Sequence, residues 1–235
     1  MKNYIRVGAS FIVKYLSPAI DIIQNFLGLL ILNRKFSPKL RGIRKFNTRE
    51  DLWTFSTNYL EASNKIISFL EFGVHEGYSI NYFSKLLKDK DSNLYGFDSF
   101  EGLPESWRNF INVYPSNHFN VDGKVPFSKD SRVSFIKGWF NSTLPEFLNI
   151  NKEKLTNSDY LLVHMDADIY SSTLYVLTLL AQIPKDLYCI FDELPGEESR
   201  ALYDFITSYG MECEFLGFTG PSKIFPMQVF LRIYK

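Results

Sequence analysis

The 235-residue sequence has no excess of positive charge, because Lys and Arg together number 26 and Asp and Glu also number 26. Such a chain has no pervasive basic surface to neutralise a phosphate backbone, so we expect no nucleic-acid partner. Cysteine is scarce, and Cys189 and Cys213 are too far apart to form a Cys-x-x-Cys motif. This spacing argues against a zinc site and a disulfide framework. It predicts two reduced, buried thiols in a cytoplasmic protein.

Long hydrophobic runs are also missing. The apolar stretch at 19–32 is interrupted by Asp21, Gln24 and Asn25, and it falls short of the roughly 20 residues that a membrane-spanning helix needs. Near the start, Lys14 breaks a shorter apolar run, and no small-residue cleavage pattern follows, so we expect no signal peptide.

A basic run follows the apolar stretch directly, and its cations are Arg34, Lys35, Lys39, Arg41, Arg44 and Lys45. An apolar helix followed by cations is compatible with residues 19–45 lying on an anionic membrane. The alternative is a helix that docks on the protein, followed by a solvated linker. We favour docking, because an interfacial helix needs a cleaner polar face. Residues 1–60 are therefore interpreted as an N-terminal helical extension that docks, acts as a lid or contacts a second subunit of a homodimer.

From residue 66 the pattern alternates between strands and helices, which is typical of a parallel sheet with crossover helices. Apolar spacing predicts two helix faces, one formed by Ile80, Phe83 and Leu87 and one by Leu174, Leu177 and Leu180. Strand-like runs occupy 66–72, 93–98, 132–138, 160–168 and 187–193. Two further runs, 213–219 and 228–234, have no helix between them and must pair antiparallel. We therefore expect an α/β fold in which a mostly parallel, seven-stranded, Rossmann-like sheet ends in an antiparallel hairpin, with helices on both faces.

The organisation expected from this pattern is one domain at 61–235 that follows the extension. Within it, residues 99–131 lack strong periodicity and begin directly after a strand. Irregular segments of this length are usually lids or binding loops, and a tolerated insertion is the alternative.

A glycine turn follows the first of these strands in the sequence EFGVHEGYSI. Gly73 and Gly77 are four residues apart, and a dinucleotide fingerprint requires glycine where this chain has His75 and Glu76 or Tyr78. These side chains obstruct a pyrophosphate, so a ligand without one, such as S-adenosylmethionine, fits better. Its positive groups would face Glu71, and Ser79 would cap the helix that receives its carboxylate. A glycine turn that only connects strand to helix is the alternative.

Acidic and aromatic residues at the next strand ends suit a nucleoside. Asp98 lies 25 residues after Gly73, near the interval at which a carboxylate reaches a ribose diol, and Ser99 follows it. This spacing does not separate NAD from S-adenosylmethionine. After the third strand come Gly138, Trp139 and Phe140, which are placed to border an adenine, although Trp139 is equally compatible with the core.

Four carboxylates follow the last two parallel strands. Asp166 and Asp168 would point to the same side if their strand extends that far, and Asp192 and Glu193 end the next strand. Because adjacent strands lie about 5 Å apart, we expect these groups to converge and repel one another. An oxygen-only ligand set suits Mg²⁺ or another divalent cation. Helix caps or solvated strand ends are the alternative. We interpret His164 as a structural residue of the strand and His75 as an adjunct to the ligand.

Together these motifs resemble the macrocin O-methyltransferase family of metal-dependent class I S-adenosylmethionine enzymes. The match is carried by EFGVHEGYSI, YGFDSFEGLPE, KGWFNSTLP, HMDADIYSST and FDELPGEESRALYDF, in that order over residues 71 to 205. The resemblance implies methyl transfer from S-adenosylmethionine to a small-molecule hydroxyl, often a sugar hydroxyl in natural product biosynthesis. It implies Mg²⁺ bound by Asp166, Asp192 and Glu193, with Asp168 as general base. Glu193 departs from the usual aspartate, which keeps a non-catalytic cofactor-binding scaffold as the alternative. An NAD-dependent oxidoreductase is a second one.

Overall fold

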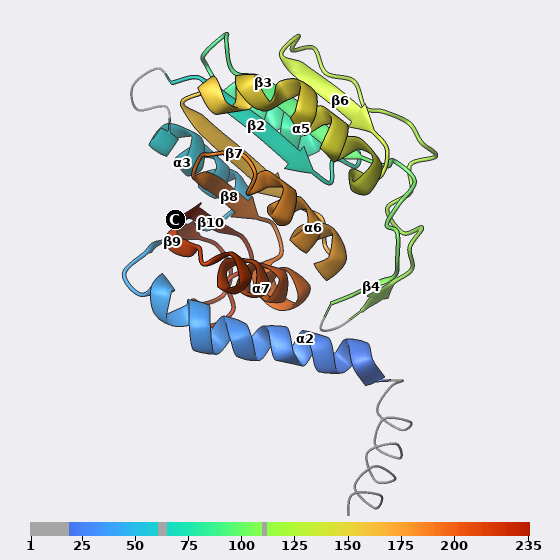
Figure 1. Ribbon diagram of the computed structural model, residues 1–235. Coiled ribbons are helices and arrows are strands. Elements are labelled where there is room, and N and C mark those ends of the chain that lie inside the picture. Colours follow the sequence, from blue (N-terminus) through green and yellow to red (C-terminus); the bar gives the residue numbers. More distant parts are fainter. Residues whose placement is uncertain (1–18, 61–64, 110–111) are drawn as a thin grey trace, which may run out of the picture.

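The computed structural model describes residues 19–60, 65–109 and 112–235, and an eight-stranded sheet lies at the centre of this part of the chain (Figure 1). The strand order is β1-β9-β10-β8-β7-β2-β3-β6. These strands are β1 (Arg44–Lys45), β2 (Ile67–Phe72), β3 (Asn93–Asp98), β6 (Val133–Lys137), β7 (Tyr160–Met165), β8 (Leu187–Phe191), β9 (Glu212–Phe218) and β10 (Val229–Tyr234).

Strand direction confirms the expected sheet. β10 pairs antiparallel with both β8 and β9, and the other neighbouring strands pair parallel. The sheet has eight strands where seven were expected, because the two residues of β1 join its edge by pairing with β9. The order reverses beside β2, since β3 lies on one side of it and β7 on the other. Open α/β sheets bind ligands at such a switch point, outside the carboxyl ends of the strands.

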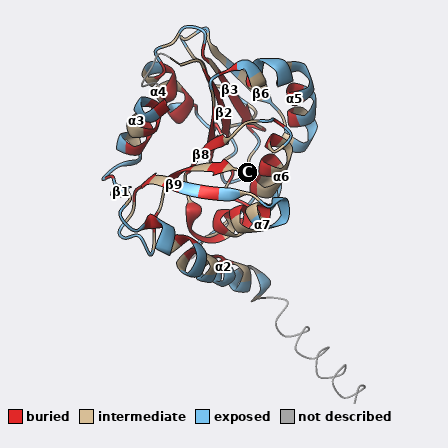
Figure 2. Cartoon of the chain, turned by 60° about the vertical axis from the view of Figure 1, so that its left-hand side comes forward, coloured by how far each residue is buried: buried red, intermediate tan, exposed pale blue. Residues whose placement is uncertain are grey.

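Helices cover both faces of the sheet, as Figure 2 shows. Phe72, Leu177 and Phe205 belong to one buried apolar cluster, and Trp53 and Phe83 belong to the other. Three helices of the later chain therefore cover the first face, together with the N-terminal extension described below, and two earlier helices cover the second. The bounds are α3 (Arg49–Leu60) and α4 (Tyr78–Leu86) for the second face, and α5 (Phe140–Asn157), α6 (Tyr170–Leu180) and α7 (Ser199–Tyr209) for the first.

The expected helix faces are found at these positions. Ile80, Phe83 and Leu87 are buried, as are Leu177 and Leu180, and Leu174 is half-buried against the same core. Cys189 and Cys213 are buried free thiols, as expected. Two strands end earlier than the sequence pattern indicated, β7 at Met165 and β8 at Phe191. The acidic residues that follow them therefore belong to loops.

The N-terminal extension docks on the α7 side of the molecule. It contains α2 (Ile20–Ile31), a π-helical turn η2 (Leu32–Phe36) and a 3₁₀ turn η3 (Ser37–Leu40). In Figure 1, α2 crosses the lower edge of the molecule, and it contacts α7 and the irregular turn η4 (Leu194–Glu198). No helix within the described ranges is both long and apolar enough to cross a membrane. The short apolar run with Lys14, and with it the expectation about a signal peptide, lies outside the described residues.

The irregular segment 99–131 contains one small antiparallel pair, formed by β4 (Trp107–Arg108) and β5 (Val113–Tyr114). It runs past the carboxyl ends of the parallel strands, where Asn25 of α2 donates a hydrogen bond to the Arg108 carbonyl at 2.6 Å. The segment thereby joins the extension to the edge of the sheet where the parallel strands end.

Candidate active site

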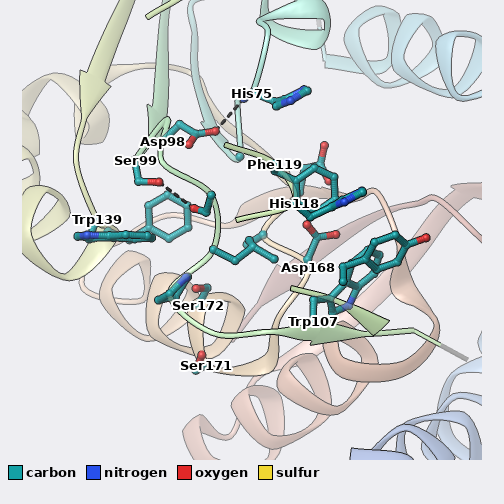
Figure 3. Close-up of a pocket in the computed structure, with 18 of the residues that line it drawn as sticks. His75, Asp98, Ser99, Trp107, His118, Phe119, Trp139, Asp168, Ser171 and Ser172 are labelled. Carbon is teal, nitrogen blue, oxygen red and sulfur yellow. Dashed lines mark hydrogen bonds between the residues drawn. The ribbon is translucent and has the colours of Figure 1, made fainter. Parts of the chain in front are cut away.

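A cavity of about 980 Å³ opens at the carboxyl ends of β2, β3, β7 and β8. Its wall combines loops after these strands with the start of α5, the start of α6 and the 99–131 segment (Figure 3). Of the residues expected to form a site, those that line it are Gly73, Asp98, Ser99, Trp139, Phe140, Asp166, Asp168, Asp192 and Glu193. One cavity therefore brings together the predicted cofactor and carboxylate residues.

The glycine turn is shaped by one close approach, at Gly73, and one left-handed residue, Gly77. A Cβ at Gly73 would lie 1.9 Å from the Asp166 carbonyl oxygen, so only glycine lets the end of β2 pass this close to the end of β7. Gly77 has a φ of +81° and precedes α4 directly. This left-handed conformation favours glycine. The expectation that Ser79 caps the helix is wrong, because α4 begins after Gly77 and has no side-chain cap.

Asp98 closes the glycine turn from the end of β3. One carboxylate oxygen accepts hydrogen bonds from the backbone N–H groups of Val74 (2.8 Å) and His75 (2.7 Å), and the other accepts one from Phe100 (2.7 Å). The oxygen that accepts only from Phe100 has a second lone pair, so Asp98 keeps acceptor capacity there. The expected contact with a ribose stays a prediction, and the three backbone hydrogen bonds hold the Asp98 carboxylate in place.

Asp166 and Asp168 lie in the loop after β7, so strand alternation does not set the direction of their side chains. β7 ends at Met165, so the expectation that both side chains point the same way along an extended strand is wrong. Asp168 instead has a φ of +61°, a left-handed conformation that Asp tolerates better than most residues. Asp168 lines the same cavity as Trp107, His118 and Phe119 (Figure 3).

The carboxylates raise one another's pKa values. Burial, followed by the charges of Asp192 and Asp168, raises the pKa of Asp166 well above its usual range. Burial and Glu193 do the same to the pKa of Asp168. The pKa of Glu193 rises to about 7, first through burial and then through Asp192. Perturbed acids in a cavity are typical of functional sites.

Two further charged groups belong to this cluster without lining the cavity. Glu198 is 1% exposed, and its pKa is raised well above its usual range by burial and then by Asp168. His164 hydrogen-bonds Glu71 at 2.8 Å, while its Nε2 atom is 3.8 Å from Asp192 Oδ1, too long for a hydrogen bond. Burial alone lowers the His164 pKa, but the two carboxylates outweigh it and raise the pKa to about 10. A protonated His164 places one positive charge between the Glu71 and Asp192 carboxylates.

Glu71 does not face the cavity. It is fully buried and bound to His164, so the expected contact with a ligand's positive groups is not formed by this arrangement. Gly77, Ser79 and Gly138 are likewise outside the cavity wall. They shape the backbone around it.

The carboxylates have the chemistry of ligands for a divalent cation, but their positions do not form a site around one. Their oxygens are hard donors, they repel one another, and Asp192 Oδ1 is buried without a hydrogen-bond partner among the described residues. However, in the ranges that the structure describes, no three His, Cys, Asp or Glu side chains come together in an arrangement that could hold a metal ion. The sequence expectation of a converged ligand set is thus met only in part, because the groups are neighbours without a common centre.

Arg49 is the one Arg or Lys among the described residues that line the cavity. It begins α3, where a reciprocal pair of hydrogen bonds between Thr48 and Asp51 fixes the first helical turn. Its guanidinium carbon lies 5.4 Å from the centre of the Tyr78 ring, and Nη1 is 3.8 Å from Asp192 Oδ2. Arg49 therefore brings a positive charge from the N-terminal extension to the glycine turn.

The 99–131 segment adds an aromatic wall. The rings of Trp107 and Tyr114 stack with centroids 4.9 Å apart, and the Tyr114 ring lies 4.6 Å from the His118 ring. Phe119 extends the group toward His75, whose ring is 6.0 Å away. Neither this wall nor Arg49 was expected from the sequence. Their only local signals were the aromatic content of an aperiodic segment and the Thr48-x-x-Asp51 spacing.

Comparison with known proteins agrees with the fold. The sequence model of a family described as a methyltransferase domain matches residues 70–192. Among solved structures, the O-methyltransferase NovP has a TM-score of 0.55 and 21% identity, over 77% of this chain and 78% of that chain. This likeness supports the fold.

Two other similar structures are more distant. An O-methyltransferase from Bacillus cereus, solved in complex with SAH, has a TM-score of 0.47 and 12% identity, over 79% of this chain and 81% of that one. TomG from Streptomyces achromogenes, an O-methyltransferase involved in tomaymycin synthesis and solved with SAM, has a TM-score of 0.44 and 11% identity, over 79% and 80%. No curated protein matches the chain.

The matched stretch covers just over half of the chain and runs from the middle of β2 to the end of β8. It includes the glycine turn, Asp98 and the carboxylates Asp166, Asp168 and Asp192, which the structure gathers around one cavity. This chain belongs to the methyltransferase domain family.

Proposed function

We propose that this methyltransferase moves the methyl group of S-adenosylmethionine to a hydroxyl group of a small molecule. The observation that carries the proposal is the single cavity that joins the glycine turn, Asp98 and Asp168. A donor site and a general base are thereby available to the same bound pair of reactants. The resemblance to macrocin O-methyltransferases supports a sugar or natural-product hydroxyl as the acceptor.

Contacts to the ribose, the adenine and the methionine carboxylate would position the donor. Asp98, with Ser99 beside it, would accept hydrogen bonds from the ribose hydroxyls, as acids at this strand end do in related folds. Trp139 and Phe140 border the place for the adenine. The methionine carboxylate would lie at the glycine turn, where Arg49 offers a cation of opposite charge beside the first residue of α4.

The acceptor then occupies the remaining space between Asp168 and the aromatic wall. Its hydroxyl oxygen attacks the methyl carbon, the carbon–sulfur bond breaks, and S-adenosylhomocysteine leaves with the electron pair on a neutral sulfur. Asp168 receives the hydroxyl proton as general base. Because no covalent enzyme intermediate is needed, positioning of the two reactants supplies much of the rate.

A divalent cation forms the second part of this proposal. Asp166, Asp192 and Glu193 are the residues that would hold it. When bound, such an ion supplies positive charge that orients the acceptor hydroxyl and lowers its pKa. The chain also has its own basic groups near these carboxylates, because Arg49 and His164 each lie 3.8 Å from the Asp192 carboxylate.

The donor assignment is tested by calorimetric titration of the full-length protein with S-adenosylmethionine and, separately, with NAD. We expect saturable binding of S-adenosylmethionine and no heat of binding for NAD. The reverse result would replace the proposal with the oxidoreductase alternative. If neither binds, a glycine turn that only connects strand to helix is the better interpretation.

The cation assignment needs a separate titration with MgCl₂, using the wild type and Asp192→Asn after treatment with chelator. We expect Mg²⁺ binding to the wild type and at least tenfold weaker binding to the variant, because it loses one anionic ligand. Equal binding to both proteins, or none to either, would remove Mg²⁺ from the proposal. In that case Arg49 and His164 would be the counter-charges of the site.

A further inference from the structure

Helix α2 exposes an apolar face that no described part of the protein covers. Its docked side places Asn25 and Gly28 against the protein, and both are buried. The large apolar side chains on its outer side are each between 42% and 59% exposed, and they are Ile20, Ile22, Ile23, Phe26, Leu27 and Leu30. Figure 2 shows this outer side as exposed along the helix. Helical spacing of three, four and seven residues joins the six side chains into one continuous surface, the α2 face.

This concentration is unusual within the molecule. Fifteen large hydrophobic residues are exposed in the described chain, and six of them are on this one 12-residue helix. Single exposed hydrophobic residues are normal, whereas a contiguous apolar surface indicates contact with a protein or membrane. The α2 face is therefore a candidate docking surface.

Charge identifies the kind of partner. Residues 1–49 contain ten of the 26 Lys and Arg residues and one of the 26 acidic residues, so they carry +9 and the rest of the chain carries −9. Strong asymmetry of this kind in a chain of zero net charge indicates an anionic partner for the basic part. The six cations of the basic run, from Arg34 to Lys45, follow α2 directly, and all six are exposed.

Internal partners leave most of this charge available. Lys39 is 3.8 Å from Glu212 and donates a hydrogen bond to the Cys213 carbonyl at 3.0 Å. Lys45 donates one to the Pro221 carbonyl at 3.1 Å. Lys35 and Arg44 lie over aromatic rings, at 5.7 and 4.9 Å, and neither a ring nor a carbonyl neutralises a cation. Exposed ion pairs of this length contribute little to stability. A second copy of the chain would bring another basic run, with six further cations, to this surface, so self-association through the α2 face is opposed by repulsion. Nucleic acid would satisfy the cations and leave the apolar face in water.

We propose that α2 and the basic run bind the surface of an anionic lipid bilayer. The helix is about 18 Å long, as expected for 12 residues, so it lies along the interface. Its six apolar side chains enter the boundary of the acyl chains, and the cations from Arg34 to Lys45 contact anionic headgroups. This surface replaces the solvated linker that the sequence pattern favoured. The sequence pattern left docking on the protein and contact with a membrane as alternatives. In the structure one side of α2 packs on the protein and the other faces outward, so the two are compatible.

The test is sedimentation of the full-length protein with phosphatidylcholine vesicles that contain or lack phosphatidylserine. We expect binding only to the vesicles with phosphatidylserine, and about tenfold weaker binding at high salt because the headgroup attraction is screened. Arg34→Gln with Arg41→Gln should weaken binding in the same direction. Failure to sediment with anionic vesicles at low salt would overturn the proposal.

Variants of the apolar face give the specific control. Phe26→Glu with Leu27→Glu should abolish vesicle binding, whereas Ile150→Glu, at a 69% exposed position on α5, should bind as the wild type does. Circular dichroism checks that all three proteins are folded. Equal loss for both variants would mean that binding is not through the α2 face. A dimer in light scattering that Phe26→Glu dissociates, without vesicle binding by the wild type, would assign the face to a second copy instead.

Discussion

At the scale of single residues, the site is a balance between crowded acids and a few cations that come from elsewhere in the chain. Asp166, Asp168, Asp192 and Glu193 could be placed together from the sequence, because residues after adjacent parallel strands meet at one edge. Arg49 could not be, since it precedes the glycine turn by 24 residues and belongs to a separate helix. Its place depends on how α3 packs, which no local pattern encodes.

Replacing Asp168 with Asn removes the proposed general base with little change in shape. Asn also tolerates a positive φ, so the loop conformation at +61° should persist. We expect the rate of methyl transfer to fall by about 10² to 10⁴ and the affinity for S-adenosylmethionine to change little. The measurement is release of S-adenosylhomocysteine with an acceptor that the wild type methylates. An unchanged rate would remove Asp168 from the mechanism.

Replacing Arg49 with Gln tests the contact to the methionine carboxylate. Binding of S-adenosylhomocysteine should weaken by about tenfold to hundredfold, because a hydrogen bond to a charged group contributes about 1.5 to 3 kcal/mol. Methylthioadenosine lacks the amino-acid end and should bind both proteins equally. Arg41→Gln, which changes an exposed cation outside the cavity wall, is the matched control. Equal weakening of both ligands by Arg49→Gln would contradict the assigned contact.

At the scale of helices and strands, the parallel core follows from apolar runs that fit buried strands, and its predicted strands are all found. The positions at which strands end are predicted less well from sequence, as β7 illustrates. The run at 160–168 continues as an alternating pattern, yet Asp168 turns into a left-handed conformation and the ladder stops at Met165. Sequence alternation does not report this change, because it depends on the loop that fits under α6. The docking of α2 was predicted, whereas its exposed apolar side was not.

Gly28→Ala tests how closely α2 is docked. Ala is normally more stable than Gly in a helix by about 1 kcal/mol. Here, a Cβ would lie 2.1 Å from the Gly196 carbonyl oxygen in η4, so the backbones must separate. Ser199 also donates a hydrogen bond to the Gly28 carbonyl at 3.0 Å. We therefore expect urea denaturation to show a lower free energy of unfolding. A more stable variant would contradict the close approach.

At the scale of the whole molecule, the crowded carboxylates should set the pH dependence of stability. The folded-state pKa values of Asp166, Asp168, Glu193 and Glu198 are raised, with Glu193 at about 7. The folded protein then binds more protons than the unfolded chain between pH 5 and 8. Stability should fall as pH rises through this range. His164 adds the same sign from its ordinary pKa of 6.5 upward, and its contribution is fully lost once the pH passes its folded-state pKa of about 10. Asp130 and Asp159 have lowered pKa values, so their contributions are lost only in more acidic solution.

Urea denaturation at several pH values between 5 and 8, in the presence of chelator, measures this dependence. We expect a lower midpoint at pH 8 than at pH 5.5. Glu198→Gln removes one buried carboxylate and should flatten the profile, whereas the exposed Glu146→Gln on α5 should leave it unchanged. A midpoint that rises with pH would show that folding does not raise the pKa values of these carboxylates.

The molecule as a whole divides into parts that the sequence specifies to different degrees. The sheet, the glycine turn and the acidic strand ends are encoded by local patterns, and these patterns also indicated the class of cofactor. The aromatic wall at Trp107 and Tyr114 and the charge from Arg49 depend on how aperiodic segments fold over that sheet. These parts line the cavity, and only the structure brings them together.

The central claim is that the methyl donor lies over the Gly73 turn between β2 and β7. A crystal structure of the protein with S-adenosylhomocysteine tests it most directly. The account predicts a ligand whose ribose hydroxyls contact Asp98 and whose carboxylate lies within hydrogen-bond distance of Arg49. A ligand bound elsewhere, or one turned so that its adenine covers the glycine turn, would contradict it.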